Sequence, residues 1–156
     1  WQNTFHIGRH LKASFLLNWS LGGKIYNYSE TYMCGSGWTN QYRKMINSWH
    51  PVRNPDSDIP RAGCHNPMHP SDFMIYDASY LRLKSAALSY TFDLNKTKVM
   101  KDLTLTLSGE NLFLISEYPG FDPDVSTESD SSTLRRVDLG AYPKARTYIM
   151  SVQFRF

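Results

Sequence analysis

Apolar and polar residues alternate over the last thirteen residues of the chain, from Lys144 to Phe156. One side of the pattern is apolar (Tyr148, Met150, Val152, Phe154, Phe156), and the other side is polar except for Ile149. This alternation predicts a β-strand with one apolar and one polar face. A soluble strand averages about 5–6 residues, whereas a strand that crosses a bilayer at a tilt needs about 9–11. The segment alone fits a transmembrane barrel strand and the last strand of a soluble β-sandwich equally well.

The same alternation recurs earlier in the chain. It predicts a strand stub over residues 1–7 and further strands over 11–21, 80–92 and 103–111. Residues 8–10 form a predicted turn, and Gly22-Gly23 ends the second strand. The chain therefore holds about four full strands and a stub, all with one apolar face.

The connections between these strands alternate in length. Residues 8–10 and 93–102 are short, whereas 26–78 and 113–142 are long. Within 26–78 we expect one helix over 39–48, capped by Thr39, and otherwise irregular loop. Membrane barrels have short periplasmic turns and long extracellular loops, and an up-and-down meander places alternate connections on opposite sides. Since a β-sandwich does not require this parity, the pattern favours a barrel.

The predicted fold class is therefore all-β: antiparallel, up-and-down transmembrane barrel strands with long extracellular loops. In such a barrel the apolar face contacts lipid and the polar face lines the lumen. The predicted lipid-facing residues are Ala13, Phe15, Leu17, Trp19, Leu88, Tyr90, Leu103, Leu105, Leu107, Met150, Val152, Phe154 and Phe156.

Composition narrows the function classes. Aromatic residues make up 14% of the chain, which suits interface girdles and sugar-binding surfaces. The net charge of +3 is scattered, without a Lys/Arg block, so a nucleic-acid surface is excluded. No window approaches the run of about eighteen apolar residues that indicates a transmembrane helix. Because the chain starts within a strand pattern and without Met, we expect a mature chain or a fragment of a longer protein.

The two cysteines, Cys34 and Cys64, lie thirty residues apart in the first long loop. In an exported protein we expect a disulfide between them, and two unpaired thiols are the alternative. A metal site at Cys64, His65 and His69, with His50 and Cys34 upstream, is disfavoured because no CxxC or HExxH spacing is present. We therefore predict no metal and no cofactor.

Five segments in order resemble one family. They are GGKIYN (22–27), DIPR (58–61), ASYLRLKSAALSYTF (78–92), SGENLFLISEYPGFDPDV (108–125) and YPKARTYIMSVQFRF (142–156). Together they resemble the C-terminal end of SusC/RagA-type TonB-linked outer-membrane transporters, so that residues 1–156 would be the C-terminal part of such a barrel. No single motif is decisive, but the order and spacing are family-like over nearly the whole chain.

The resemblance implies a 22-stranded barrel in the bacterial outer membrane, with extracellular loops and a periplasmic C-terminus. It also implies an N-terminal plug, energy supplied through TonB, and import of oligosaccharides or peptides under a SusD-like lipoprotein lid. The plug and the TonB-interacting segment are absent from this chain. The partners implied are the rest of the barrel, the plug, the lid, TonB and outer-membrane lipid, and the expected role is not enzymatic.

The second long loop carries Asp122, Asp124, Glu128 and Asp130. An EF-hand starting at Asp122 needs Gly at its sixth position, where this chain has Thr127. Glycoside hydrolysis needs two rigid carboxylates about 5–9.5 Å apart, and a Ser/Thr-rich loop does not suggest such rigidity. We expect instead that the turn 119–123 is structural, with Asp122 as its cap.

Aromatic residues in the two loops are candidates for stacking on a substrate. The alternative is that they pack the loops or contact the lid. These candidates are Trp38, Tyr42, Trp49, Tyr118 and Phe121. On the strands, Arg82, Lys84 and Glu110 could line the lumen or pair with one another. The competing functions are a soluble β-sandwich that binds carbohydrate and, further behind, an envelope enzyme.

Overall fold

The computed structural model describes residues 1–34, 39–63, 71–94, 100–125 and 136–156. The chain divides into two compact units, which are described separately. One unit, the large sheet, comprises Trp1–Leu21, Ser79–Glu117 and Pro143–Phe156. The other, the small unit, comprises Gly22–Ala78 and Tyr118–Tyr142.

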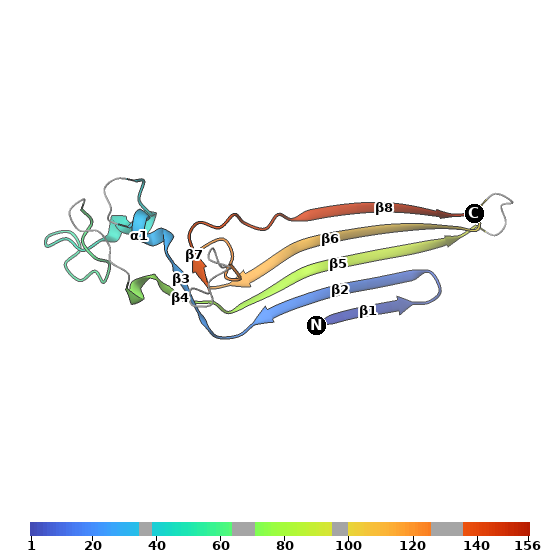
Figure 1. Cartoon of the computed structure of the whole chain (residues 1–156), viewed down its shortest axis with the longest axis horizontal. Coiled ribbons are helices and arrows are strands. Elements are labelled where there is room, and N and C mark those ends of the chain that lie inside the picture. The colour runs from blue at the N-terminus through green and yellow to red at the C-terminus, as the bar shows by residue number, and fades with distance from the viewer. Residues whose placement is uncertain (35–38, 64–70, 95–99, 126–135) are drawn as a thin grey trace. The chain divides into compact units, whose positions relative to one another are not determined.

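The large sheet has five antiparallel strands in the order β1-β2-β5-β6-β8 (Figure 1). The strands are β1 (Gln2–Ile7), β2 (Leu11–Ser20), β5 (Tyr80–Asp93), β6 (Asp102–Ser116) and β8 (Thr147–Arg155). The strands of this sheet are neighbours in the same order in which they follow one another along the chain, so the topology is an up-and-down meander. The all-β prediction is confirmed. The sheet is open, with β1 and β8 at its edges.

Strand β6 extends five residues beyond the predicted end at Asn111. The alternation changes phase there, which is why the pattern alone ended the strand. The structure has a bulge at this height: the register shifts between Leu83 and Ser85, and Asn111 has a φ of 52°. Asn tolerates this left-handed conformation better than most residues. After the bulge, Phe113 pairs with Leu83, so the apolar pattern resumes in phase.

The small unit contains structure that the sequence pattern did not predict. Its mixed three-stranded sheet has the order β4-β3-β7, formed by Ile75–Asp77, Lys24–Asn27 and Val137–Asp138. A short helix α1 (Ser29–Met33) and two 3-10 helices, η1 (Arg43–Asn47) and η2 (Asp72–Met74), complete it. Strands of two to four residues are too short for alternation to be recognised, so this region was predicted as irregular loop.

The predicted helix over residues 39–48 is wrong in type and extent. The structure has only the five-residue 3-10 helix η1, and Tyr42 occupies the N-cap position. Thr39, the predicted cap, instead donates its hydroxyl hydrogen bond to the carbonyl oxygen of Tyr32 at 2.7 Å. A hydroxyl that binds another segment cannot cap a helix that starts at residue 39.

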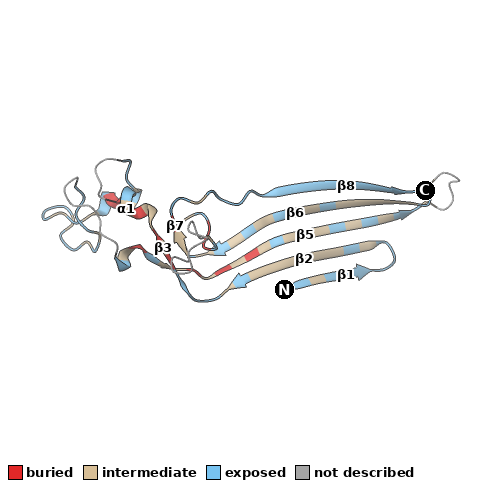
Figure 2. Ribbon diagram, in the orientation of Figure 1, coloured by how far each residue is buried: buried red, intermediate tan, exposed pale blue. Residues whose placement is uncertain are grey.

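Burial differs between the two units (Figure 2). The small unit has a conventional core, in which Ile25 and Ala78 are fully buried and Tyr118 is nearly so, with Tyr76 and Val125 packed against them. In the large sheet most described residues are half-buried or exposed, and every residue of β8 is exposed. The strands carry apolar side chains that this part of the chain leaves largely uncovered.

Candidate functional site

The register of the large sheet separates its side chains into two faces. Residues that pair across neighbouring strands point to the same face, and successive residues point to opposite faces. The pairs Ala13–Leu88, Leu88–Leu107 and Leu107–Met150 therefore form one row across four strands. The whole apolar face consists of six such rows, from Trp19, Leu81 and Ile115 at one end to Phe92, Leu103 and Phe154 at the other.

The residues predicted to face lipid belong to this apolar face by register. Phe156 follows the last residue of β8 and is 72% exposed. Other members are also exposed for such large apolar side chains, including Leu107 at 60% and Met150 at 72%. Contact of these side chains with lipid remains a prediction.

The opposite face is polar and carries a hydroxyl network. Thr91 and Thr104 hydroxyls lie 3.0 Å apart, and the Thr106 hydroxyl donates to Ser89 at 2.9 Å. Asn18 donates its side-chain amide to the Tyr80 hydroxyl at 3.3 Å. Arg82, on the same face, is 5% exposed and lies 5.6 Å from the centroid of the Tyr80 ring. These side chains suit a surface that faces water or polar protein rather than lipid.

Arg82 and Glu110 both belong to the polar face by register, and Lys84 is the extra residue at the bulge. The position of Arg82 and Glu110 on the polar face is compatible with the predicted role in lining a lumen. That role remains a prediction.

A buried ionic cluster holds the small unit together. Glu30 of α1 is 2% exposed, and its Oε2 accepts a hydrogen bond from Lys44 Nζ at 2.7 Å. Its Oε1 accepts from the Tyr76 hydroxyl at 2.6 Å and from the Asn27 amide at 3.3 Å. Lys44 Nζ also lies 4.3 Å from the centroid of the Phe73 ring. The cluster therefore joins α1, η1, η2 and β4.

The Glu30 carboxylate changes the titration of two of its neighbours, Lys44 and Tyr76. Burial tends to lower the pKa of Lys44, but its hydrogen bonds to Glu30 and Tyr76 and the charge of Glu30 outweigh burial and raise the pKa. Burial and the hydrogen bond to Glu30 raise the pKa of Tyr76. Every polar atom named here has a charged or hydroxyl partner, which is what a buried polar group requires. We therefore interpret the cluster as a structural element that stabilises the small unit.

A second polar contact fixes the other segment of the small unit. The Tyr118 hydroxyl donates to Asp138 Oδ2 at 2.7 Å, and Asp138 Oδ1 accepts from the backbone of Ala141 at 3.0 Å. Burial and then this hydrogen bond raise the pKa of Tyr118. The predicted structural turn at 119–123 is confirmed in one respect: Asp122 Oδ1 accepts the backbone N–H of Asp124 at 2.9 Å.

The five candidate substrate-stacking aromatics differ in accessibility. Phe121 is 67% exposed and Trp49 is 38% exposed, so both could reach a ligand. Tyr42 is half-buried, and Tyr118 is 6% exposed within the core of the small unit. Trp38 lies outside the described residues. Substrate contact remains a prediction for all five, and the burial of Tyr118 favours the packing alternative for that residue.

Cys64, the predicted disulfide partner of Cys34, lies outside the described residues, so the disulfide remains a prediction. Cys34 is fully buried, and burial raises the pKa of its thiol to about 11. Of the metal-site residues weighed above, His65 and His69 also lie outside the described ranges. Within those ranges, no three His, Cys, Asp or Glu side chains are placed to hold a metal ion.

Sequence reasoning missed Glu30, Asn27 and Asp138 as members of a polar core. Asn27 and Asp138 stand beside aromatic or aliphatic residues, whereas Glu30 lies between Ser29 and Thr31. Neither context distinguishes a buried polar side chain from a solvated one. In the described part of the chain, no helix is long and apolar enough to cross a membrane.

Comparisons with known proteins agree with this architecture. No family model matches the chain. The chain is 35% identical over 144 residues to TonB-dependent receptor P3 of Formosa agariphila, which covers 88% of the chain and 14% of that receptor. It is 33% identical over 89 residues to TonB-dependent receptor SusC of Bacteroides thetaiotaomicron, covering 55% of the chain and 8% of SusC.

Among solved structures, the RagAB peptide transporter superposes with a TM-score of 0.77 at 23% sequence identity. The superposition covers 92% of this chain and 16% of the transporter chain. The sequence thus spans less than a fifth of the length of each of these three proteins.

Proposed function

We propose, from the premise that this chain belongs to the SusC/RagA type of TonB-dependent outer-membrane transporters, that it supplies barrel wall and extracellular loops to a nutrient importer. The large sheet is the wall, and the small unit is the extracellular part. The complete protein closes a 22-stranded barrel around a plug and draws energy from TonB. The chain itself performs no catalysis.

The observation that carries this proposal is the height of the apolar face. The six apolar rows span eleven paired positions along β5 and β6, which are ten steps along the strand. At about 3.4 Å per residue this is about 34 Å along the strand. With strands tilted by about 40°, the face is about 26 Å tall, close to the apolar band of about 25 Å on outer-membrane barrels.

The exposure of this face argues against the soluble alternative. A carbohydrate-binding β-sandwich buries such a face against a second sheet about 10 Å away. Here Tyr148 and Met150 are 71% and 72% exposed. Membrane lipid is the solvent that suits them. The polar face, with its Ser and Thr hydroxyls, then lines the lumen.

The small unit is the proposed contact region for a SusD-like lid and for substrate. Its segment 47–59 is internally braced and remains accessible. Trp49 donates its backbone N–H to Ile59 at 2.8 Å, and the Ser57 hydroxyl donates to the Asn47 carbonyl at 2.6 Å. Val52, within this segment, is 82% exposed. Rigid, exposed loops on a fixed scaffold are where binding groups usually lie.

The substrate is an oligosaccharide or a peptide. Trp49 and Phe121 are the exposed aromatic candidates for contact with either, because a flat ring packs on a sugar face or on an apolar peptide side chain.

The experiment removes the first loop from the complete transporter without disturbing the wall. Lys24 and Asp77 are paired across β3 and β4, so an Asn-Gly turn can join them in place of residues 25–76. The variant should still insert into the outer membrane, while co-purification of the lid and uptake are lost. Trp49→Ala and Phe121→Ala serve as matched single changes, which should lower uptake while the lid stays bound. Normal uptake and lid binding by the loop-deleted transporter would refute a functional role for the loop.

A further inference from the structure

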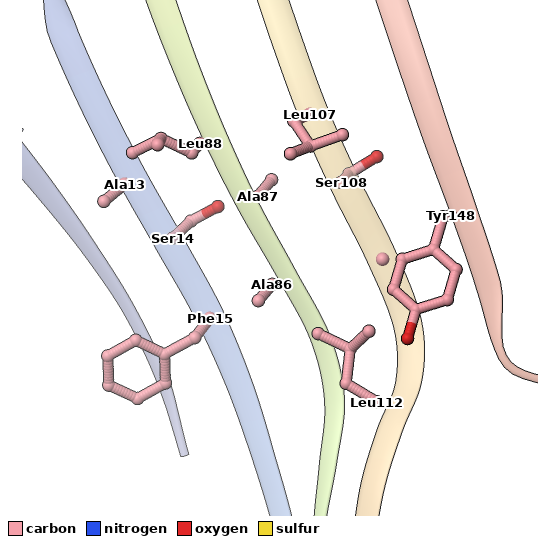
Figure 3. Close-up of a pocket in the computed structure, with 11 residues that line it drawn as sticks. Ala13, Ser14, Phe15, Ala86, Ala87, Leu88, Leu107, Ser108, Leu112 and Tyr148 are labelled. Carbon is pink, nitrogen blue, oxygen red and sulfur yellow. The ribbon is translucent and has the colours of Figure 1, made fainter.

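The apolar face of the large sheet is not uniform: it contains a hollow of about 380 Å³. Figure 3 shows its lining, which comes from β2, β5, β6 and β8. Ala86 and Gly109, which pair across β5 and β6, form the floor. The larger side chains of Phe15, Leu112 and Tyr148 stand around Ala86 in Figure 3. The hollow lies wholly within one unit of the chain.

The register explains why the face is hollow here. Phe15, Ala86, Gly109 and Tyr148 are consecutive partners in one row across the sheet. The two central members are the small ones, so a gap two strands wide separates the rings of Phe15 and Tyr148. With strands about 4.8 Å apart, the flanking strands lie about 14 Å from each other. Leu88 and Leu107 in the next row close one side.

The bulge closes the other side of the hollow. Leu112 follows Asn111, whose positive φ re-aims the chain. A Cβ atom at Gly109 would lie only 2.5 Å from Leu112 Cδ2, so the Leu112 side chain occupies the space beside this glycine. Gly109 and the bulge together place the Leu112 side chain as the wall of the hollow on this side.

The position of the hollow limits what can fill it. It lies at the third and fourth of the six apolar rows, which is the middle of the apolar band. No lining residue is charged. At this depth a bilayer offers acyl tails, and lipid head groups are confined to the two edges of the band. An acyl tail matches the lining in chemistry and the site in depth.

We propose that this hollow is a binding site for the terminal part of a phospholipid acyl chain. The inference rests on the proposed function, because it requires the apolar face to contact lipid. Lipid tails are as apolar as the face itself, so burial from water does not select this site. Selection comes from packing, since a tail that fills the hollow gains dispersion contacts that a flat surface does not provide. The tail is therefore ordered here and mobile over the rest of the face.

The test uses the complete transporter in vesicles of phosphatidylethanolamine that carries a diazirine near the end of one acyl chain. After photolysis, mass spectrometry locates the adducts on the protein. Adducts should concentrate on the peptides that contain Ala86 and Gly109. Ala86→Leu fills the hollow and should lower their yield at least about threefold, as a loss of a few packing contacts would. Val152→Leu adds volume to the same face outside the hollow and should leave the yield unchanged.

A second variant, Tyr148→Ala, removes one wall of the hollow and should also lower the adduct yield. It replaces Ala86→Leu in the test if that variant does not insert into the membrane. Adducts spread evenly over the apolar face would overturn the site while leaving the membrane barrel intact. Labelling of the rest of the face with protection of the hollow would overturn it too, because a protein partner would then fill the space. Adducts on the polar face alone would refute the proposed function itself.

Discussion

The large sheet and the small unit treat the same kinds of residue in opposite ways. In the small unit, Ile25 and Met74 are fully buried, as aliphatic side chains are in a soluble domain. In the large sheet, Leu107 and Met150 are 60% and 72% exposed. Carboxylates show the same contrast, because Glu30 of the small unit is 2% exposed and hydrogen-bonded, whereas Glu110 of the large sheet is exposed.

This difference in burial indicates the solvent that surrounds each region. The small unit contains its own core, and its buried carboxylate Glu30 is paired with Lys44, so its packing resembles that of a soluble domain. The strands of the large sheet pair their backbone groups with one another, but the described residues leave its apolar face without cover. Under the proposed function, lipid covers that face. Substitutions should therefore act by different rules in the two regions.

The largest effect is expected in the buried ionic cluster. Lys44→Met leaves the Glu30 carboxylate, with a side chain only 3% exposed, without its cation. Removing one partner of a buried pair costs about 3–5 kcal/mol, and we expect the lower part of this range because Lys44 is 29% exposed. Hydrogen exchange in the complete transporter should show faster opening of α1 and η1, with the β5–β6 pair unchanged.

Lys24→Met is the matched control, because Lys24 and Asp77 form an exposed pair in the same unit at 3.9 Å. Such a pair contributes about 0–1 kcal/mol, so exchange should barely change. Equal effects of the two substitutions would contradict a structural role for the buried cluster.

The next largest effect should distinguish the faces of the large sheet. Leu105→Arg places a charge on the apolar face, one row away from the two middle rows, and should destabilise the inserted protein by about 2 kcal/mol, the lower end of the cost at the bilayer midplane. Thr104→Arg places the same charge on the polar face and should cost much less. Urea unfolding of the transporter in lipid vesicles measures both. A larger cost for Thr104→Arg would reverse the assignment of the faces.

Tyr118→Phe should have a smaller effect, confined to the small unit. It leaves Asp138 Oδ2 without the hydroxyl that lies 2.7 Å away, and an unsatisfied buried acceptor costs about 1–3 kcal/mol. Tyr148→Phe, at a tyrosine that is 71% exposed, is the control and should be close to neutral. Limited proteolysis of residues 118–142 should accelerate only in the first variant. Unchanged proteolysis would mean that the hydrogen bond to Asp138 does not hold this segment.

The strands of the large sheet were predictable because each one is long enough to show its period. The predicted start of β2 at Leu11 and of β5 at Tyr80 are both confirmed. The end of β6 was missed because a bulge shifts the phase at Asn111, and alternation alone cannot distinguish a shift from an end. The family was predicted from five short motifs, which no periodic pattern would have supplied.

The small unit could not be predicted in the same way. Its strands β3 and β7 pair across more than a hundred residues, Tyr26 with Val137, and their four and two residues show no period of their own. The carboxylate of Glu30 gains its importance from Lys44 and Tyr76, which only the folded chain brings to it. Tertiary contacts, rather than local sequence preference, determine this region.

The smallest effect at neutral pH is expected from the titration of the buried groups, which should make the small unit less stable at alkaline pH. The pKa values of Lys44, Tyr76 and Tyr118 are all raised in the folded small unit. A group whose pKa is higher in the folded state stabilises it fully below the unfolded pKa, about 10 for Tyr and 10.4 for Lys, and loses that contribution as pH rises through the folded value. The small unit should therefore open above about pH 10. Tyrosinate absorbance during an alkaline titration of the transporter should show a group of tyrosines that ionise only at high pH. The Tyr118→Phe variant should have one fewer tyrosine in this group. If Tyr118→Phe instead removed an early-ionising tyrosine, the Tyr118 hydroxyl would be solvated and its contact with Asp138 would not protect it.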